Sequence, residues 1–278
     1  MKGLLFYDAE GARRNKWFIN RLIEAAQELG HNLELVIHEG RSDEAFIAPV
    51  AFALVRTICP ELTKEAESRA IHTFNNYSTA FTANDKWQTY LLAKKLGLDV
   101  MDTKAVADAE EAMTAFPFPL ILKTVDGHGG SEVFMAETAE KCKEIFSLLG
   151  DKRVIAQKVC SEPGIDMRVY VLGGEILACV KRSSETDFRS NFSLGGRAEV
   201  VHPDEGVKMA VRRIYGELKC DFVGIDFIRH DGKWILNEIE DVVGTRMLYA
   251  KTDIDPAYEY MRYITHKIEK AEEICTTN

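Results

Sequence analysis

One stretch near the carboxyl end, residues 222–244 (FVGIDFIRHDGKWILNEIEDVVG), constrains the fold most strongly. Two apolar runs, Phe222–Ile228 and Trp234–Ile239, flank a turn that contains Asp231-Gly232, and this pattern predicts a β-hairpin. Acidic residues interrupt these otherwise apolar strands, one in the first strand and two in the second: Asp226, Glu238 and Glu240.

The three carboxylates of this hairpin predict a metal site. Alternate residues of a strand share a face, so Glu238 and Glu240 project together with α-carbons roughly 6.5–7 Å apart. Carboxylates that share an apolar surface repel one another and resist desolvation. A divalent cation would relieve both effects, and an oxygen-only donor set suits Mg²⁺ or Mn²⁺ better than zinc. The competing interpretation places the three acids at solvated strand ends.

The register of the hairpin decides whether Asp226 joins the other two acids. Opposed residues of an antiparallel pair point to the same face. A loop of two or four residues would put Asp226 opposite Asn237, whereas the three-residue loop Asp231–Lys233 would put it opposite Glu238. We therefore predict the odd loop, or a bulge with the same effect.

Composition argues mildly against two classes of partner. The 278 residues include 44 acidic and 35 basic side chains, and the net charge of −9 argues against a nucleic-acid or anionic-membrane partner. The six cysteines are scattered without metal-ligand spacing, which indicates reduced thiols of a cytoplasmic protein. The first apolar run is too short for a signal peptide, and no stretch reaches the length of a membrane span.

The beginning of the chain reads as β-α-β, with strands over 3–7 and 33–37 and a helix over 17–29. This order predicts a small parallel-sheet domain. No glycine fingerprint follows the first strand, which argues against a dinucleotide site there. A second section opens near Asn84-Asp85-Lys86 with a helix over 86–96, and a short helix is expected over Ala105–Phe116.

A glycine-rich loop, residues 126–131 (DGHGGS), separates two expected strands at 119–125 and 132–136. It lacks the Gly-Lys-Ser/Thr ending of a Walker loop and opens no helix, so that motif is excluded. Its glycines either let backbone N–H groups approach phosphate oxygens or serve only the turn geometry. Lys123 favours the phosphate site, because a lysine within an apolar strand is costly to bury without an anionic partner.

A second polar segment, residues 181–196, directly follows an expected strand and contains Lys181, Arg182 and Arg189. It is either a solvated loop or a clamp for phosphate and carboxylate groups, which the planar fork of arginine suits.

Taken together, these segments resemble the ATP-grasp enzymes, and within them the RimK-like group of glutamate ligases. The resemblance depends on Asp166-Met-Arg168, on Asp187-Phe-Arg-Ser-Asn191 with Gly195-Gly196, and on Gly224-Ile-Asp226 followed by Asn237-Glu-Ile-Glu240. It implies an α/β (α+β) ATP-grasp fold in which two α+β subdomains clasp ATP. The expected units are an N-terminal α/β domain (1–82), a lid subdomain (83–155) and a C-terminal subdomain with the metal site (156–278).

The resemblance also implies roles for individual residues. ATP phosphates would meet Lys86 and Lys123 under the closing loop of Gly127, Gly129, Gly130 and Ser131, with Ser190 and Asn191 beside the triphosphate. Gln157, Lys158 and Val159 would lie along the adenine, largely through backbone groups, and Glu162 or Asp166 would reach the ribose. Asp226, Glu238 and Glu240 would hold the metals, and Arg168, Arg182 and Arg189 would orient the acceptor carboxylate or the transferring phosphoryl group.

Three positions depart from the family pattern. The family usually has asparagine where this chain has Glu240, an acidic residue where it has Lys158, and an aromatic residue where it has Val159. Glutamate still ligates Mg²⁺ but adds negative charge to the site.

The implied function is an ATP-dependent carboxylate–amine ligase that forms an amide through an acyl phosphate. It would add an amino acid such as glutamate to a small molecule or peptide, and the resemblance is compatible with a homo-oligomer. Two alternatives stay open: a catalytically degenerate ATP-binding regulatory protein, and an ATP-grasp kinase that leaves a stable phosphorylated product.

Overall fold

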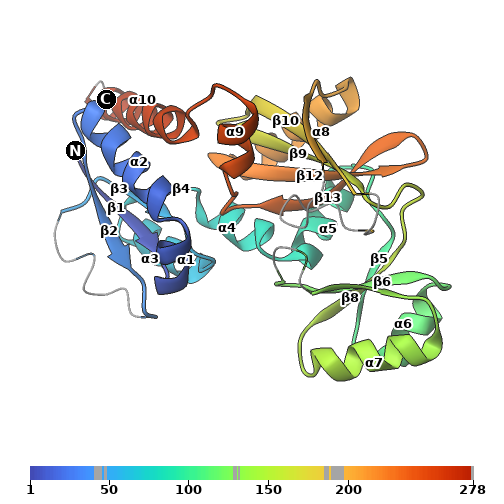
Figure 1. Cartoon of the computed structure of the whole chain (residues 1–278). Coiled ribbons are helices and arrows are strands. Elements are labelled where there is room, and N and C mark those ends of the chain that lie inside the picture. The colour runs from blue at the N-terminus through green and yellow to red at the C-terminus, as the bar shows by residue number, and fades with distance from the viewer. Residues whose placement is uncertain are drawn as a thin grey trace.

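The computed structural model describes residues 1–40, 46, 49–127, 130, 132–184, 188 and 197–276. Its strands form three sheets, with the N-terminal sheet on the left of Figure 1 and the other two on the right. The predicted mixed α/β fold is confirmed. No helix in the described ranges is long and apolar enough to cross a membrane.

The N-terminal sheet is parallel, with strand order β2-β1-β3-β4. Its strands are β1 (Lys2–Tyr7), β2 (Asn32–Ile37), β3 (Phe52–Val55) and β4 (His72–Phe74). The helices α1 (Ala9–Arg14), α2 (Lys16–Glu28) and α3 (Pro60–Ser68) connect them. The C-terminal helix α10 (Pro256–Thr276) packs against α2, which brings the two ends of the chain to the same side of the molecule (Figure 1).

The carboxyl ends of β1 and β3 meet at one edge of this parallel sheet, as the strand direction requires. Asp8 follows β1 and caps α1 by accepting a hydrogen bond from the Gly11 N–H at 2.7 Å. Thr57 follows β3 and donates its hydroxyl to the same carboxylate at 3.0 Å. This edge faces the rest of the molecule.

The middle sheet is antiparallel, with order β5-β8-β6-β7. Its strands are β5 (Thr103–Val106), β6 (Leu120–Thr124), β7 (Val133–Ala136) and β8 (Val154–Lys158), and the helices α6 (Ala109–Ala115) and α7 (Ala139–Leu149) cover one face (Figure 1). Because side chains alternate along a strand, Leu120 and Leu122 pack under the helices, whereas Ile121 and Lys123 point away from them.

The helix expected over 105–116 is wrong at its beginning. Residues 103–106 form β5, which pairs with β8, and the helix starts only after Asp108. The Asp108 side chain accepts from the Glu111 N–H at 2.8 Å, an N-cap that fixes the helix start. The expected unit boundary after residue 155 falls inside β8.

The C-terminal sheet has five antiparallel strands in the order β11-β10-β9-β12-β13. They are β9 (Ile165–Leu172), β10 (Glu175–Ser183), β11 (Arg197–Val201), β12 (Phe222–His230) and β13 (Lys233–Glu240). The remaining helices are α4 (Tyr77–Ala83), α5 (Lys86–Lys95), α8 (Glu205–Leu218) and α9 (Arg246–Lys251).

The two faces of this sheet have different partners. Met167, Val169 and Val171 of β9 share a core with α5 and α8. The residues between them, Arg168 and Tyr170, therefore project from the opposite face, which also carries Asp226. Alternation along β9 and β12 thus collects buried charged side chains on one face.

The predicted hairpin register is confirmed through the bulge. The turn has only two residues, Asp231 and Gly232, with φ of +47° and +72°, as a type I′ turn requires. Asp226 nevertheless lies opposite Glu238, because Phe227 pairs with Leu236 and Asn237 is left as an extra residue in β13. The three-residue loop does not form, and the bulge at Asn237 replaces it.

Candidate active site

A cavity lies between the middle sheet and the polar face of the C-terminal sheet, and we call it the intersheet cavity. The predicted site residues that line it are Lys86, Lys123, Gly127, Gly130, Gln157, Lys158, Val159, Asp166, Arg182, Asp226, Glu238 and Glu240. Gly129, Ser131, Arg189, Ser190 and Asn191 lie outside the described residues. Glu162, which is not among the lining residues, accepts from the Gly232 N–H at 3.2 Å.

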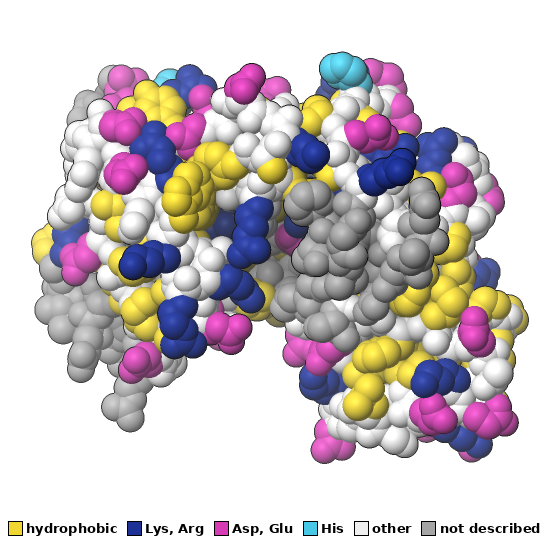
Figure 2. Space-filling model, in the orientation of Figure 1, with side chains coloured by type: hydrophobic (Ala, Val, Ile, Leu, Met, Phe, Trp, Pro, Cys, Tyr) yellow, Lys and Arg dark blue, Asp and Glu magenta, His cyan; other side chains and the backbone are white. Residues whose placement is uncertain are grey.

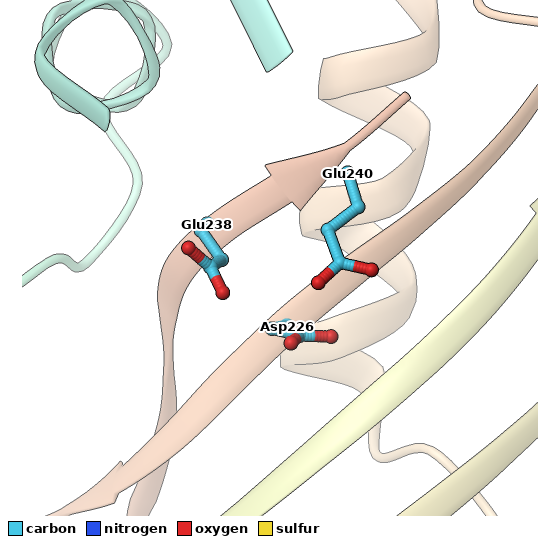
Figure 3. Close-up of side chains that lie close together, drawn as sticks. All are labelled: Asp226, Glu238 and Glu240. Atoms are coloured by element: carbon cyan, nitrogen blue, oxygen red, sulfur yellow. The ribbon is translucent and has the colours of Figure 1, made fainter. Parts of the chain in front are cut away.

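The three acids of the hairpin converge at one wall of this cavity (Figure 3). One carboxylate oxygen from each of Asp226, Glu238 and Glu240 lies within 4.8 Å of the other two. Asp226 comes from β12 and is buried, while Glu238 and Glu240 come from β13 and are partly exposed. The spacing inferred from strand alternation therefore brings all three together.

Two arginines share the charge of Asp226. Arg168 donates from Nε and Nη2 to the two Asp226 oxygens at 2.8 and 2.7 Å, and from Nη2 to Glu240 at 2.6 Å. Arg182 donates to Asp226 at 3.0 Å. Burial alone would raise the pKa of Asp226, but the two guanidinium groups outweigh it and hold the pKa below its ordinary value. No local pattern in the chain predicted this pairing.

Arg182 also holds Asp166, with hydrogen bonds of 2.5 and 2.7 Å from Nε and Nη2. It therefore bridges Asp166 of β9 and Asp226 of β12 from its own strand, β10. The Arg182 side chain is 5% exposed, so this bridge is buried within the sheet face.

Glu240 is less well compensated than Asp226. Burial raises its pKa to about 7; Arg168 opposes that rise, and repulsion from Asp226 and Glu238 adds to it. The positive charge around Glu240 is therefore too small to offset its burial and the two neighbouring acids. A divalent cation beside Glu238 and Glu240 would supply that charge, so these oxygens fit a hard cation.

Two lysines face the same space. Lys123 is 9% exposed and donates to the side-chain oxygen of Asn237, the bulge residue, at 3.1 Å. Burial lowers its pKa to about 8, against the opposing attraction of Glu238. Lys86, in the first turn of α5, donates to the Gly127 carbonyl and lies 3.5 Å from Glu238. Both ammonium groups are therefore placed beside the glycine loop and the acids.

Two of the residues predicted along the adenine, Gln157 and Lys158, have side chains that other residues engage. Gln157 donates its side-chain amide to the Thr103 hydroxyl at 2.9 Å, within the middle sheet. The Lys158 ammonium pairs with Asp102 at 2.7 Å. Both side chains are occupied in this way, and the Lys158 N–H also donates to the Asp102 carbonyl at 3.2 Å, while Val159 lines the cavity beside them.

A second cavity of about 660 Å³ lies between the polar edge of the N-terminal sheet and the segment that follows β13. It is lined by Asp8 and Arg56 from the N-terminal sheet and by Arg168, Gly244 and Arg246 from the other side. Arg182 and Glu240 line both cavities, so the two meet at these side chains. Sequence reasoning missed Arg56, although this arginine directly follows the apolar strand β3.

Comparison with known proteins decides the family. The RimK-like ATP-grasp domain family matches residues 83–264, well over half of the chain. The protein belongs to the RimK-like ATP-grasp family. This chain is similar to the glutamate–LysW ligase ArgX of Sulfurisphaera tokodaii. The two are 30% identical over 261 residues, which cover 90% of each chain.

Solved structures agree on the fold. This chain is similar to a RimK domain ATP-grasp protein from Sphaerobacter thermophilus, with a TM-score of 0.74 and 17% identity. The match covers 95% of this chain and 100% of that one. It is also similar to the D-alanine–D-alanine ligase of Bacillus anthracis solved with ATP, with a TM-score of 0.76, 15% identity and coverage of 98% and 99%.

These comparisons confirm the predicted ATP-grasp fold and the predicted enzyme class, an ATP-dependent ligase that forms an amide bond. An ATP-grasp family implies the use of ATP, generally with a divalent metal. The family matches only from residue 83, so the cavity edge formed by β1 and β3 of the RimK-like protein lies outside the matched range.

Proposed function

We propose that the RimK-like protein adds an amino acid, with glutamate as the first candidate, to the carboxyl group of a small molecule or peptide. One observation carries this proposal: the intersheet cavity and the second cavity meet at Arg182 and Glu240. A nucleotide in the first cavity and an acid in the second would therefore have their reacting groups at one junction. Such positioning is most of what phosphoryl transfer asks of a protein.

In this proposal ATP occupies the intersheet cavity. The ammonium groups of Lys86 and Lys123 neutralise its phosphates beside Gly127 and Gly130, and the backbone of residues 157–159 contacts the adenine. Asp166 is the better candidate for the ribose, since it lines the cavity, whereas Glu162 bonds to the β12–β13 turn.

Asp226, Glu238 and Glu240 would hold Mg²⁺ or Mn²⁺, which when bound neutralises the charge of the β- and γ-phosphates. Support for this comes from the convergence of their oxygens and from the raised pKa of Glu240. Arg168 and Arg182 keep Asp226 ionised and in place. They would present the remaining N–H groups to the acceptor carboxylate.

The reaction proceeds in two balanced steps. An oxygen of the acceptor carboxylate attacks the γ-phosphorus of ATP, so that an acyl phosphate forms and ADP leaves. The nitrogen of the amine then attacks the acyl carbon, loses a proton and expels inorganic phosphate, which leaves the amide. Neither step requires a covalent nucleophile of the protein.

The proposal is tested by ADP release over a panel of amino acids, dipeptides and small carboxylic acids, with mass spectrometry of the products. We expect ADP release that requires both an acid and an amine, and a product mass equal to their sum less one water. ADP release with the acid alone and a stable phosphorylated product would indicate a kinase instead. Tight ATP binding with no turnover on any pair would indicate a regulatory protein.

A further inference from the structure

We infer that the second cavity binds a carboxylate that takes no part in the reaction, and that Arg56 is the residue that recognises it. This inference rests on the proposed ligase function and names the chemical class of its substrate. At least one of the two substrates would carry a carboxylate besides any group that reacts.

Arg56 is a buried cation without an acidic partner. Its side chain is 5% exposed, and it donates from Nη2 to the backbone carbonyl of Val243 at 2.7 Å. Its guanidinium carbon lies 5.6 Å from the centre of the Phe18 ring. Among the described residues no carboxylate forms an ion pair with it, and its buried Nε has no hydrogen-bond partner. A buried charge left in this state is costly, and an anionic ligand would relieve the cost.

Asp241 is the acid to consider as an internal partner, because the positive charge of Arg56 acts to lower the pKa of its carboxyl group. Its two oxygens, however, accept from the side-chain amides of Asn75 and Asn84, at 2.6 and 3.4 Å. Burial raises the pKa of Asp241 despite these partners and Arg56. Asp241 is therefore satisfied by amides and leaves the N–H fork of Arg56 available.

The other charges of this cavity favour an anion as well. Arg246 is exposed at its wall and has no hydrogen bond or ion pair with any residue the structure describes, while Arg14 has only a 3.9 Å contact with Glu10 on the same helix. The Asp8 carboxylate is committed to the α1 cap and to Thr57. Figure 2 shows basic side chains along the boundary between the N-terminal sheet and the rest of the molecule.

The location separates this charge from the reacting centre. Arg182 and Glu240 belong to both cavities, whereas Arg56 lines the second cavity alone. A cavity of about 660 Å³ accommodates a small organic acid or the end of a peptide. A substrate that reacts at the shared side chains can thus place a second carboxylate on Arg56. Either the acid or the amine can supply this group, and the experiment distinguishes them.

A binding measurement tests the inference without turnover. Glutarate and its monoamide, glutaramate, differ only in one carboxylate, and each is titrated calorimetrically into the protein with Mg²⁺ and a non-hydrolysable ATP analogue. We expect glutarate to bind at least tenfold more tightly, and Arg56→Gln to abolish this difference. The control is Arg69→Gln, which changes an exposed arginine at the end of α3. This variant should preserve the difference in affinity. Equal affinity of the two ligands for the wild type, or a difference that survives in Arg56→Gln, would overturn the inference.

A kinetic measurement then identifies the substrate that carries the group. With an acid and an amine found by ADP release, Arg56→Gln should raise KM at least tenfold for one of them and leave KM for ATP within about twofold. The reaction is then repeated with hydroxylamine, which has no carboxylate, in place of the amine. The effect of Arg56→Gln should persist if the acid carries the second carboxylate and disappear if the amine carries it. Unchanged KM for both substrates would contradict the inference. If no pair is turned over at all, the ligase proposal fails and the calorimetric comparison still decides the role of Arg56.

Discussion

Arg168 and Asp226 lie directly opposite each other on adjacent strands, β9 and β12, and form a two-point ion pair of 2.8 and 2.7 Å. Both side chains are buried. The pair stands at the centre of the polar face, since Arg168 also reaches Glu240 and Asp226 also accepts from Arg182. Two of the three acids predicted to hold the metal, Asp226 and Glu240, are therefore already paired with arginines, while Glu238 lies beside Lys86.

Removing Arg168 should destabilise the protein strongly. Arg168→Leu leaves the buried Asp226 with only Arg182 beside it, and breaking a buried ion pair on one side costs about 3–5 kcal/mol. Urea unfolding of the metal-free protein measures the effect. Arg153→Leu, which breaks an ion pair between Asp85 and a largely exposed arginine, is the control and should cost less than about 1 kcal/mol. A loss below about 1 kcal/mol for Arg168→Leu would contradict the importance of this pair.

Glu240 should make stability depend on pH in a defined direction. Its pKa is raised to about 7 in the folded state, chiefly by burial, from an ordinary value of 4.5. The folded state therefore binds this proton more tightly than the unfolded state, so its contribution to stability is present below about pH 4.5 and is lost as the pH rises through about 7. Without metal, the free energy of unfolding should fall between pH 5 and 7.5 by more in the wild type than in Glu240→Gln.

Added Mg²⁺ provides the matching test of the same group. A cation bound at Glu240 stabilises the ionised carboxylate, so the loss of stability between pH 5 and 7.5 should shrink in the wild type and change little in Glu240→Gln. Parallel pH profiles for the two proteins, with and without Mg²⁺, would show that Glu240 does not titrate in this range.

Lys123 should take up a proton when ATP binds. Burial lowers its pKa to about 8, and phosphate oxygens at the same position would raise it again. At pH 8 about half of the lysines are neutral before binding, so uptake should approach about half a proton. Calorimetry in buffers of different ionisation enthalpy measures this uptake. Lys123→Met should abolish it, whereas Lys152→Met, an exposed lysine paired with Glu132, should not. Equal uptake in Lys123→Met and wild type would rule out this lysine as the source.

Much of the site follows from strand alternation in the sequence. Asp226, Glu238 and Glu240 interrupt apolar strands, and the requirement that they share a face correctly predicted that Asp226 lies opposite Glu238. Alternation did not predict how the chain brings Asp226 opposite Glu238, because a longer turn and a bulge at Asn237 have the same effect on the register. That choice depends on the type I′ geometry of Asp231-Gly232.

The remaining features depend on contacts between distant segments. Arg168 and Arg182 neutralise Asp226 because β9 lies between β10 and β12, an order that no local pattern in the chain specifies. Arg56 joins the second cavity through Val243, 187 positions further along the chain. The helix expected over 105–116 began too early because β5 pairs with β8 and Asp108 provides the actual cap.

The acyl-phosphate step is tested most directly by following oxygen from the acid into phosphate. An acid substrate labelled with ¹⁸O in its reacting carboxylate is incubated with ATP, Mg²⁺ and the amine, and the released phosphate is examined by mass spectrometry. The acyl-phosphate mechanism with a metal held by Glu238 predicts one ¹⁸O transferred to phosphate for each amide formed, and no ATP turnover with folded Glu238→Gln. Unlabelled phosphate beside a labelled amide, or near-normal turnover in Glu238→Gln, would contradict it.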